Sequence, residues 1–218
     1  MRAPLFDLRA GERRPALGAF LLLTLLIGGH TLLETARDAL FLSKLPAAQL
    51  ALVYALIAGL ALVLSAVNYR FVRRFGEGRA LLITLVGAAG GTTALYLVPP
   101  TPAVVFGIYV WSALLATVMV VQFWMFLAQV FTLSQARRLF GPIAAGGVVG
   151  ALLGASGAMA ALTVVPVRAL LLGAAATFVL GALLSTAIDG GGDGLAASAR
   201  ARDSTRSEPP GLERTSSE

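Results

Sequence analysis

The chain has 218 residues, of which 57% are hydrophobic and only 13% are charged. Soluble domains carry about a quarter charged residues, so this composition excludes a water-soluble globular protein as well as disordered and collagen-like classes. The absence of cysteine excludes disulfides, thiolate metal sites and a cysteine nucleophile. The formal net charge is +6. A basic chain can bind nucleic acid, so the placement of the charges along the sequence has to decide whether this chain does.

Long apolar stretches dominate the sequence. About 20 apolar residues are needed for one helix to cross a bilayer core. Pro99, Pro100 and Pro102 divide the longest charge-free run, because proline removes backbone donors and favours extended conformations. The sequence therefore predicts an all-α membrane protein with six transmembrane helices, at Ala16–Leu33, Leu50–Tyr69, Ala80–Val98, Ala103–Val130, Leu139–Val165 and Ala169–Ile188.

The positive charges fall on one side of these six spans. Fourteen of the 17 cations lie in the N-terminal segment, in the loops after the second and fourth spans, and in the tail. Arg37, Lys44 and Arg168 lie on the other side. Because cytoplasmic loops carry an excess of cations, this split predicts that both termini are cytoplasmic. The basic charge thus indicates orientation, and we expect no nucleic-acid partner.

Two further features bear on location and domain organisation. Lys44 is the only lysine among the cations, and this arginine bias is typical of a GC-rich bacterial coding sequence, which predicts a bacterial inner-membrane location. Residues 189–218 are rich in Gly, Ser, Arg, Pro and acidic residues, and they contain few apolar ones. Such a segment cannot bury a core, so we expect a membrane domain over residues 1–188 followed by a disordered cytoplasmic tail.

Ionisable residues cluster at the end of the first span. His30, Glu34, Arg37 and Asp38 lie within about 100° of arc on one helix face. Charged groups at membrane depth normally face a cavity or a partner, so one interpretation is a polar face lining a substrate path. The alternative is that the helix leaves the membrane near Leu33. His30 and Glu34 are too few for a metal site, and we expect neither metal nor cofactor.

The later spans contain two other polar or small-residue patterns. Gln122 and Gln129 are seven residues apart on one helix face, which indicates interhelical hydrogen bonds or, alternatively, contact with substrate. Gly146, Gly150 and Gly154 form two consecutive GxxxG steps, which let helix backbones approach closely. The glycine pattern predicts tight helix packing and does not point to a particular function.

Two motifs resemble the ATP/ADP antiporter family, the nucleotide translocases of plastids and intracellular bacteria, and their bacterial relatives. Residues 123–130 (FWMFLAQV) and 136–140 (ARRLF) resemble that family's FW-x-FAN-[EQ]-I and AKR-[FL]-[YF] segments. Residues 33–40 (LETARDAL) resemble its LR-x-x-KD-x-L segment. The resemblance implies one half of a major facilitator fold, exchange or uptake of nucleotides, and phosphate binding by cavity-facing basic residues. The residues expected to contact substrate are His30, Glu34, Arg37, Asp38, Gln122, Gln129, Arg137 and Arg138.

Six spans correspond to only half of such a transporter. The resemblance therefore implies that the chain pairs with a second copy or with another six-helix half. An alternative is a membrane scaffold or assembly partner derived from a transporter half. A third is an intramembrane serine protease, because residues 154–157 spell GxSG with Ser156 as the nucleophile. That activity needs a general base, and His30 is the only histidine.

Overall fold

A computed structural model describes residues 12–206, and their side chains as far as residue 188. All regular secondary structure in the described part of the chain is helical, in the order α1 (Arg13–Lys44), η1 (Ala47–Gln49), α2 (Leu50–Phe75), α3 (Glu77–Leu97), α4 (Pro102–Val130), α5 (Leu133–Ala161), η2 (Val167–Ala169) and α6 (Leu170–Arg206). Six of these helices are long and apolar enough to cross a membrane, which confirms the predicted number of spans. The chain is a multi-pass membrane protein.

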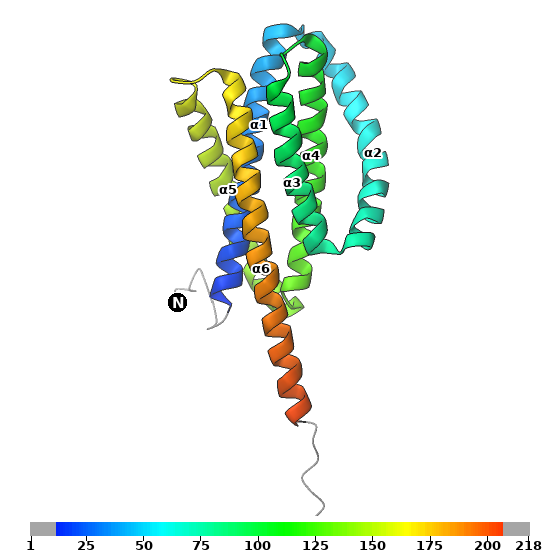
Figure 1. The fold of residues 1–218 in the computed structure, drawn as a ribbon, viewed down its shortest axis with the longest axis vertical. Helices are drawn as coiled ribbons and strands as arrows, with labels where there is room; N and C mark the ends of the chain where they lie inside the picture. The colour runs from blue at the N-terminus through cyan, green and yellow to red at the C-terminus, as the bar shows by residue number, and fades with distance from the viewer. Residues whose placement is uncertain (1–11, 207–218) are drawn as a thin grey trace, which may run out of the picture.

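Short connections make successive helices run in opposite directions (Figure 1). Pro99 and Pro100 separate α3 from α4, as predicted, and Pro102 occupies the first turn of α4, where its missing N–H is not needed. A capping box starts α5: the Thr132 backbone N–H donates to the Gln135 side chain at 2.9 Å. The helix ends are thus specified locally.

The first and last helices extend farthest beyond the predicted boundaries. The first continues through the charged residues after Leu33 and ends only at Lys44. The last runs to Arg206, so the structure differs from the expected disordered tail over residues 189–206, while residues 207–218 lie outside the described residues. Each residue added to an existing helix gains one backbone hydrogen bond, and the alanine-rich segment around 196–201 favours that extension.

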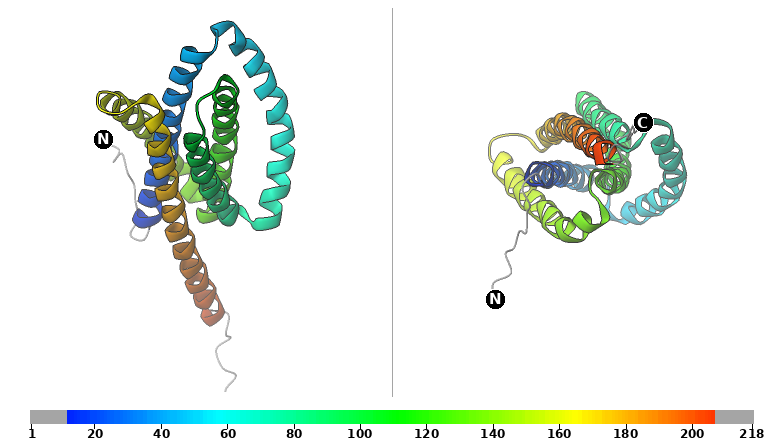
Figure 2. Two further views of the ribbon diagram at one scale, coloured as in Figure 1. Left: turned by 45° about the horizontal axis from the view of Figure 1, so that its top comes forward. Right: turned by 90° about the horizontal axis from the view of Figure 1, so that it is seen from below.

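The core lies between α1, α3, α4 and α6, with α5 packed against α1 and α2 against α4 (Figure 2). Large buried side chains fill it, including Phe41, Phe123, Phe126 and Phe178. Helix α2 contributes only Val53 and Val72 to the buried set and is the most exposed of the six. It lies at the edge of the bundle (Figure 2).

The predicted glycine stripe is the contact between α5 and α1. Gly146, Gly150 and Gly154 are buried. A Cβ at these glycines would lie 2.5, 2.4 and 2.6 Å from the carbonyl oxygens of Phe20, Thr24 and Gly28. The Thr24 hydroxyl also donates to the Gly146 carbonyl at 3.0 Å. Tight packing is therefore confirmed, and glycine is required because the two backbones touch.

The contacts between the first three helices and the last three are symmetric when α1, α2 and α3 are matched with α4, α5 and α6. Helix α1 contacts α5 and α6, and correspondingly α4 contacts α2 and α3. The pairs α1·α4 and α3·α6 complete the set. Exchanging α1–α3 with α4–α6 leaves these contacts between the triplets unchanged, whereas the contact of α2 with α3 has no counterpart of similar extent between α5 and α6. Because α1 and α4 run in opposite directions, the two triplets have inverted orientation.

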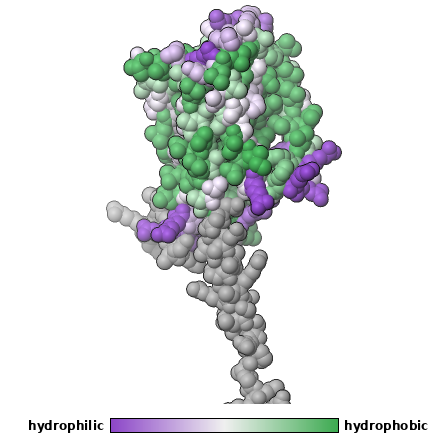
Figure 3. Space-filling view, viewed as in Figure 1, coloured by the Kyte–Doolittle hydropathy of each residue, from purple (hydrophilic) through white to green (hydrophobic). Residues whose placement is uncertain are grey.

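Charged side chains gather at the two ends of the bundle, with a largely apolar surface between them (Figure 3). One end holds the start of α1, the α2–α3 turn and the α4–α5 connection, and the end of α6 extends beyond it (Figure 1). The other end holds the charged residues 34–44 and Arg168. The second group includes the ionisable cluster that the sequence singled out.

Candidate functional site

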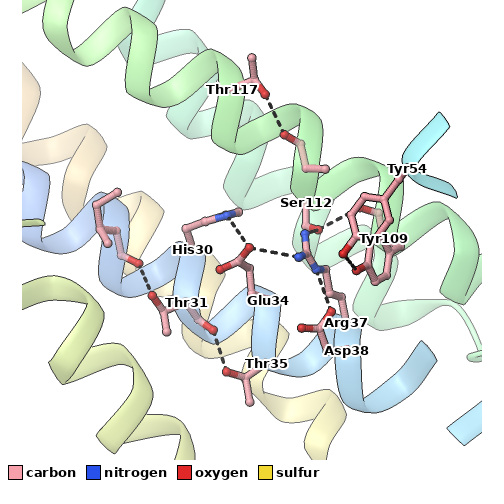
Figure 4. Close-up of polar contacts among 12 residues, drawn as sticks. His30, Thr31, Glu34, Thr35, Arg37, Asp38, Tyr54, Tyr109, Ser112 and Thr117 are labelled. Atoms are coloured by element: carbon pink, nitrogen blue, oxygen red, sulfur yellow. Dashed lines mark hydrogen bonds and ion pairs between the residues drawn. The ribbon is translucent and has the colours of Figure 1, made fainter. Parts of the chain in front are cut away.

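The ionisable residues of α1 converge on Arg37, as Figure 4 shows. Its Nη2 lies 3.1 Å from Glu34 Oε1, and its Nε donates to Asp38 Oδ1 at 3.1 Å. The Arg37 side chain is only 11% exposed, whereas Glu34 and Asp38 are 41% and 53% exposed. The helix therefore does not leave the bundle at Leu33: it carries a buried cation with two half-exposed carboxylates beside it.

Helices α4 and α2 complete the surroundings of Arg37. The Arg37 Nη1 donates to the Ser112 hydroxyl at 2.9 Å, and its guanidinium carbon lies 4.4 Å from the centre of the Tyr109 ring. The hydroxyls of Tyr109 and Tyr54 are 2.9 Å apart. The cluster thus joins three helices through one guanidinium group and one tyrosine pair (Figure 4).

All three guanidinium nitrogens of Arg37 already have acceptors. One guanidinium group thus stands beside two carboxylates. A phosphate group would have to displace Glu34 or Asp38 to reach Arg37. An open cleft of about 220 Å³ adjoins the cluster, lined by Asp38, Phe41, Leu42, Leu50, Tyr54 and Tyr109.

His30 lies one turn before Glu34 and points toward it (Figure 4). Its Nε2 is 3.3 Å from Glu34 Oε1, and its buried Nδ1 has no hydrogen-bond partner in the described part of the chain. No group of three or more His, Cys, Asp or Glu side chains suited to a metal ion occurs among the described residues. Among the described residues, His30 therefore contacts the cluster through Glu34 and is not part of a metal site.

The two glutamines of α4 make contacts between helices. Gln122 is buried, and its Nε2 donates to Asn68 Oδ1 on α2 at 2.7 Å. Gln129 Nε2 donates to Glu77 Oε2 at the start of α3. Both residues therefore hydrogen-bond across helices, and the structure places neither of them in the Arg37 cluster.

The arginines at the start of α5 lie at the opposite end of the bundle from Arg37. Arg138 Nη2 is 3.0 Å from Glu12 Oε1, and Gln135 Nε2 donates to the same oxygen at 3.2 Å. Glu12 is 8% exposed and connects the start of α1 to α5. Arg137 is exposed. The eight predicted site residues therefore divide between the two ends and the middle of the bundle.

The GxSG segment lies inside α5. The Ser156 hydroxyl donates to the Leu152 carbonyl of its own helix at 2.6 Å, and His30 contacts Glu34 on α1. No hydrogen bond between Ser156 and His30 is present in the described residues. The geometry gives no support to a serine nucleophile activated by this histidine.

Tyr109, Ser112 and Tyr54 were not predicted from the sequence. Each is a single polar residue within an otherwise apolar run, and no periodic pattern distinguishes it from a packing residue. Asn68 and Glu12 were missed for the same reason, since their partners are distant in the chain. Only tertiary contact identifies them.

Comparison with known proteins adds no assignment: no family model, curated protein sequence or solved structure matches this chain.

Proposed function

We propose that the chain is one six-helix half of a membrane transporter that works by alternating access. It would pair with a second copy or with another six-helix half, so that the solute path runs between the two. The proposal rests on one observation above all: a cation and two half-exposed carboxylates lie on α1, a helix long and apolar enough to cross a membrane. Ionisable groups within transmembrane segments normally mark a solute or ion path.

The mirrored contacts of the two helix triplets support the same proposal. Inverted repeats around a central binding site are a common architecture of secondary transporters. The exchange relates α1 to α4, and these are the helices that supply Arg37 and its partners Ser112 and Tyr109. The polar cluster thus lies at the pair of helices that this exchange relates.

Because of the motif resemblance, nucleotides and other anionic solutes are the first substrates to test. The contacts of Arg37 with Glu34 and Asp38 limit the states in which Arg37 could bind such a substrate. A phosphate would bind Arg37 only in a state in which at least one carboxylate has moved away or has been protonated. The exposed fractions of both carboxylates are compatible with such movement.

The direct test is transport by the purified full chain in proteoliposomes. We expect uptake of labelled ATP or ADP that is accelerated by unlabelled nucleotide on the opposite side. We expect Arg37→Gln to abolish it and Arg13→Gln, an exposed arginine remote from the cluster, to leave it unchanged. Absence of uptake by folded, oligomeric protein would contradict the nucleotide assignment, and absence for a panel of anions would favour the scaffold alternative.

We further propose that the start of α1 and the end of α6 face the cytoplasm of a bacterial inner membrane. Because the chain has no cysteine, single cysteines can be introduced without a background. Leu133, 74% exposed, begins α5, and Val164, 82% exposed, lies in the connection that follows the other end of α5. We expect a membrane-impermeant maleimide to label Val164→Cys in intact cells and Leu133→Cys only after permeabilisation. The reverse pattern would contradict this orientation.

A further inference from the structure

Four arginines surround the turn between α2 and α3. Arg70, Arg73 and Arg74 lie in the last turns of α2, Arg79 lies in the first turn of α3, and all four are exposed. Gly76 connects the two helices alone, with φ of 80°, a conformation that favours glycine. This tight junction keeps Arg79 within one helical turn of the end of α2. We call these four residues the α2–α3 arginine cluster.

The positive charge of this cluster exceeds the negative charge beside it. None of the four arginines forms an ion pair with another described residue. Glu77, the only acidic residue in the turn, accepts a hydrogen bond from the neutral Gln129 side chain. By contrast, Arg138 at the same end of the bundle is paired with Glu12. The α2–α3 turn thus presents four guanidinium groups beside one carboxylate.

Aromatic side chains flank the cluster. The Arg73 and Arg74 guanidinium carbons lie 5.5 Å from the Tyr69 ring and 5.8 Å from the Phe75 ring. These two rings are 59% and 41% exposed. Exposed aromatic residues at the end of a membrane span are typical of the headgroup level. The cluster therefore lies where lipid phosphates are expected.

The surface next to the cluster is apolar. Leu62, Val63 and Val67, in the turns of α2 that precede it, are more than half exposed. This arrangement places aliphatic side chains beside guanidinium groups at one edge of the apolar surface, where charged side chains gather (Figure 3). A phospholipid has the same order of groups, with acyl chains next to a phosphate.

We propose that the α2–α3 arginine cluster binds the headgroups of anionic phospholipids in the adjacent leaflet. Guanidinium groups bind phosphate oxygens in bidentate fashion, and juxtamembrane clusters of this size attract anionic lipids. A lipid fits better than a nucleic acid, because the cluster is confined to one helix junction and adjoins an acyl-binding surface. The proposal does not depend on the transport function.

The test is lipid retention by the full chain in detergent, measured by native mass spectrometry. After incubation with an equal mixture of phosphatidylglycerol and phosphatidylcholine, we expect preferential retention of phosphatidylglycerol. Arg73→Gln/Arg74→Gln is expected to lower that preference about tenfold or more. The matched control is Arg13→Gln/Arg14→Gln, which removes two exposed arginines from the same end of the bundle and is expected to retain the preference.

Three results would overturn the proposal. The first is equal retention of the two lipids by the unaltered chain. The second is an equal loss of preference in the Arg13/Arg14 control, which would indicate general charge attraction. The third is displacement of phosphatidylglycerol by a single-stranded oligonucleotide at equal phosphate concentration. Because the altered arginines are exposed, an unchanged melting temperature is expected to accompany the lipid effect.

Discussion

Replacing Gly150 by alanine is expected to lower the free energy of unfolding by about 1–3 kcal/mol, the usual cost of overpacking. The new methyl group would lie 2.4 Å from the Thr24 carbonyl oxygen and 3.0 Å from the Thr24 Cα, both backbone atoms that cannot rotate away. Helices α1 and α5 must therefore separate. Reversible unfolding by SDS in mixed micelles measures this change.

Gly157 provides a matched control on the same helix. A Cβ there meets no atom within 4 Å. Gly157→Ala is therefore expected to have no packing cost and to stabilise α5 by up to about 1 kcal/mol through its helix propensity. If both substitutions had equal effects, the α1–α5 contact would not depend on the absence of a side chain at Gly150.

Replacing Arg37 by glutamine is expected to lower the free energy of unfolding by about 2 kcal/mol, less than the cost of breaking a fully buried ion pair. The substitution leaves Glu34 and Asp38 without their cation and removes a donor to Ser112. Breaking a fully buried ion pair costs about 3–5 kcal/mol. The effect here should be smaller, because both carboxylates are half-exposed and can be hydrated in the altered protein.

The same substitution at Arg73 separates this effect from a general loss of charge. Arg73 is exposed and has no ion pair among the described residues. Arg73→Gln is expected to change the free energy of unfolding by less than about 0.5 kcal/mol. The SDS unfolding assay compares the two variants directly, and Arg37→Lys should fall between them, because an ammonium keeps the charge and loses the planar fork. An equal, small effect at both arginines would contradict the interpretation of Arg37 as the centre of the cluster.

Hydropathy and proline placement predicted the membrane spans well, because lipid requires long apolar helices whose backbone groups bond internally. The breaks at Pro99–Pro102 and the glycine stripe at Gly146, Gly150 and Gly154 also appear in the structure as predicted. The predicted end of the first helix was less accurate. The predicted span ended at Leu33, whereas the helix is continuous to Lys44 and contacts α4 through Arg37.

The sequence by itself determined six apolar helices, their order and the position of the ionisable residues on one face of the first helix. It could do so because these features depend on residues close together in the chain. The tertiary structure alone decided that Ser112 and Tyr109 of α4 complete the surroundings of Arg37, and that Gln122 and Gln129 connect α4 to its neighbours. Those partners come from different helices, and only packing brings them together.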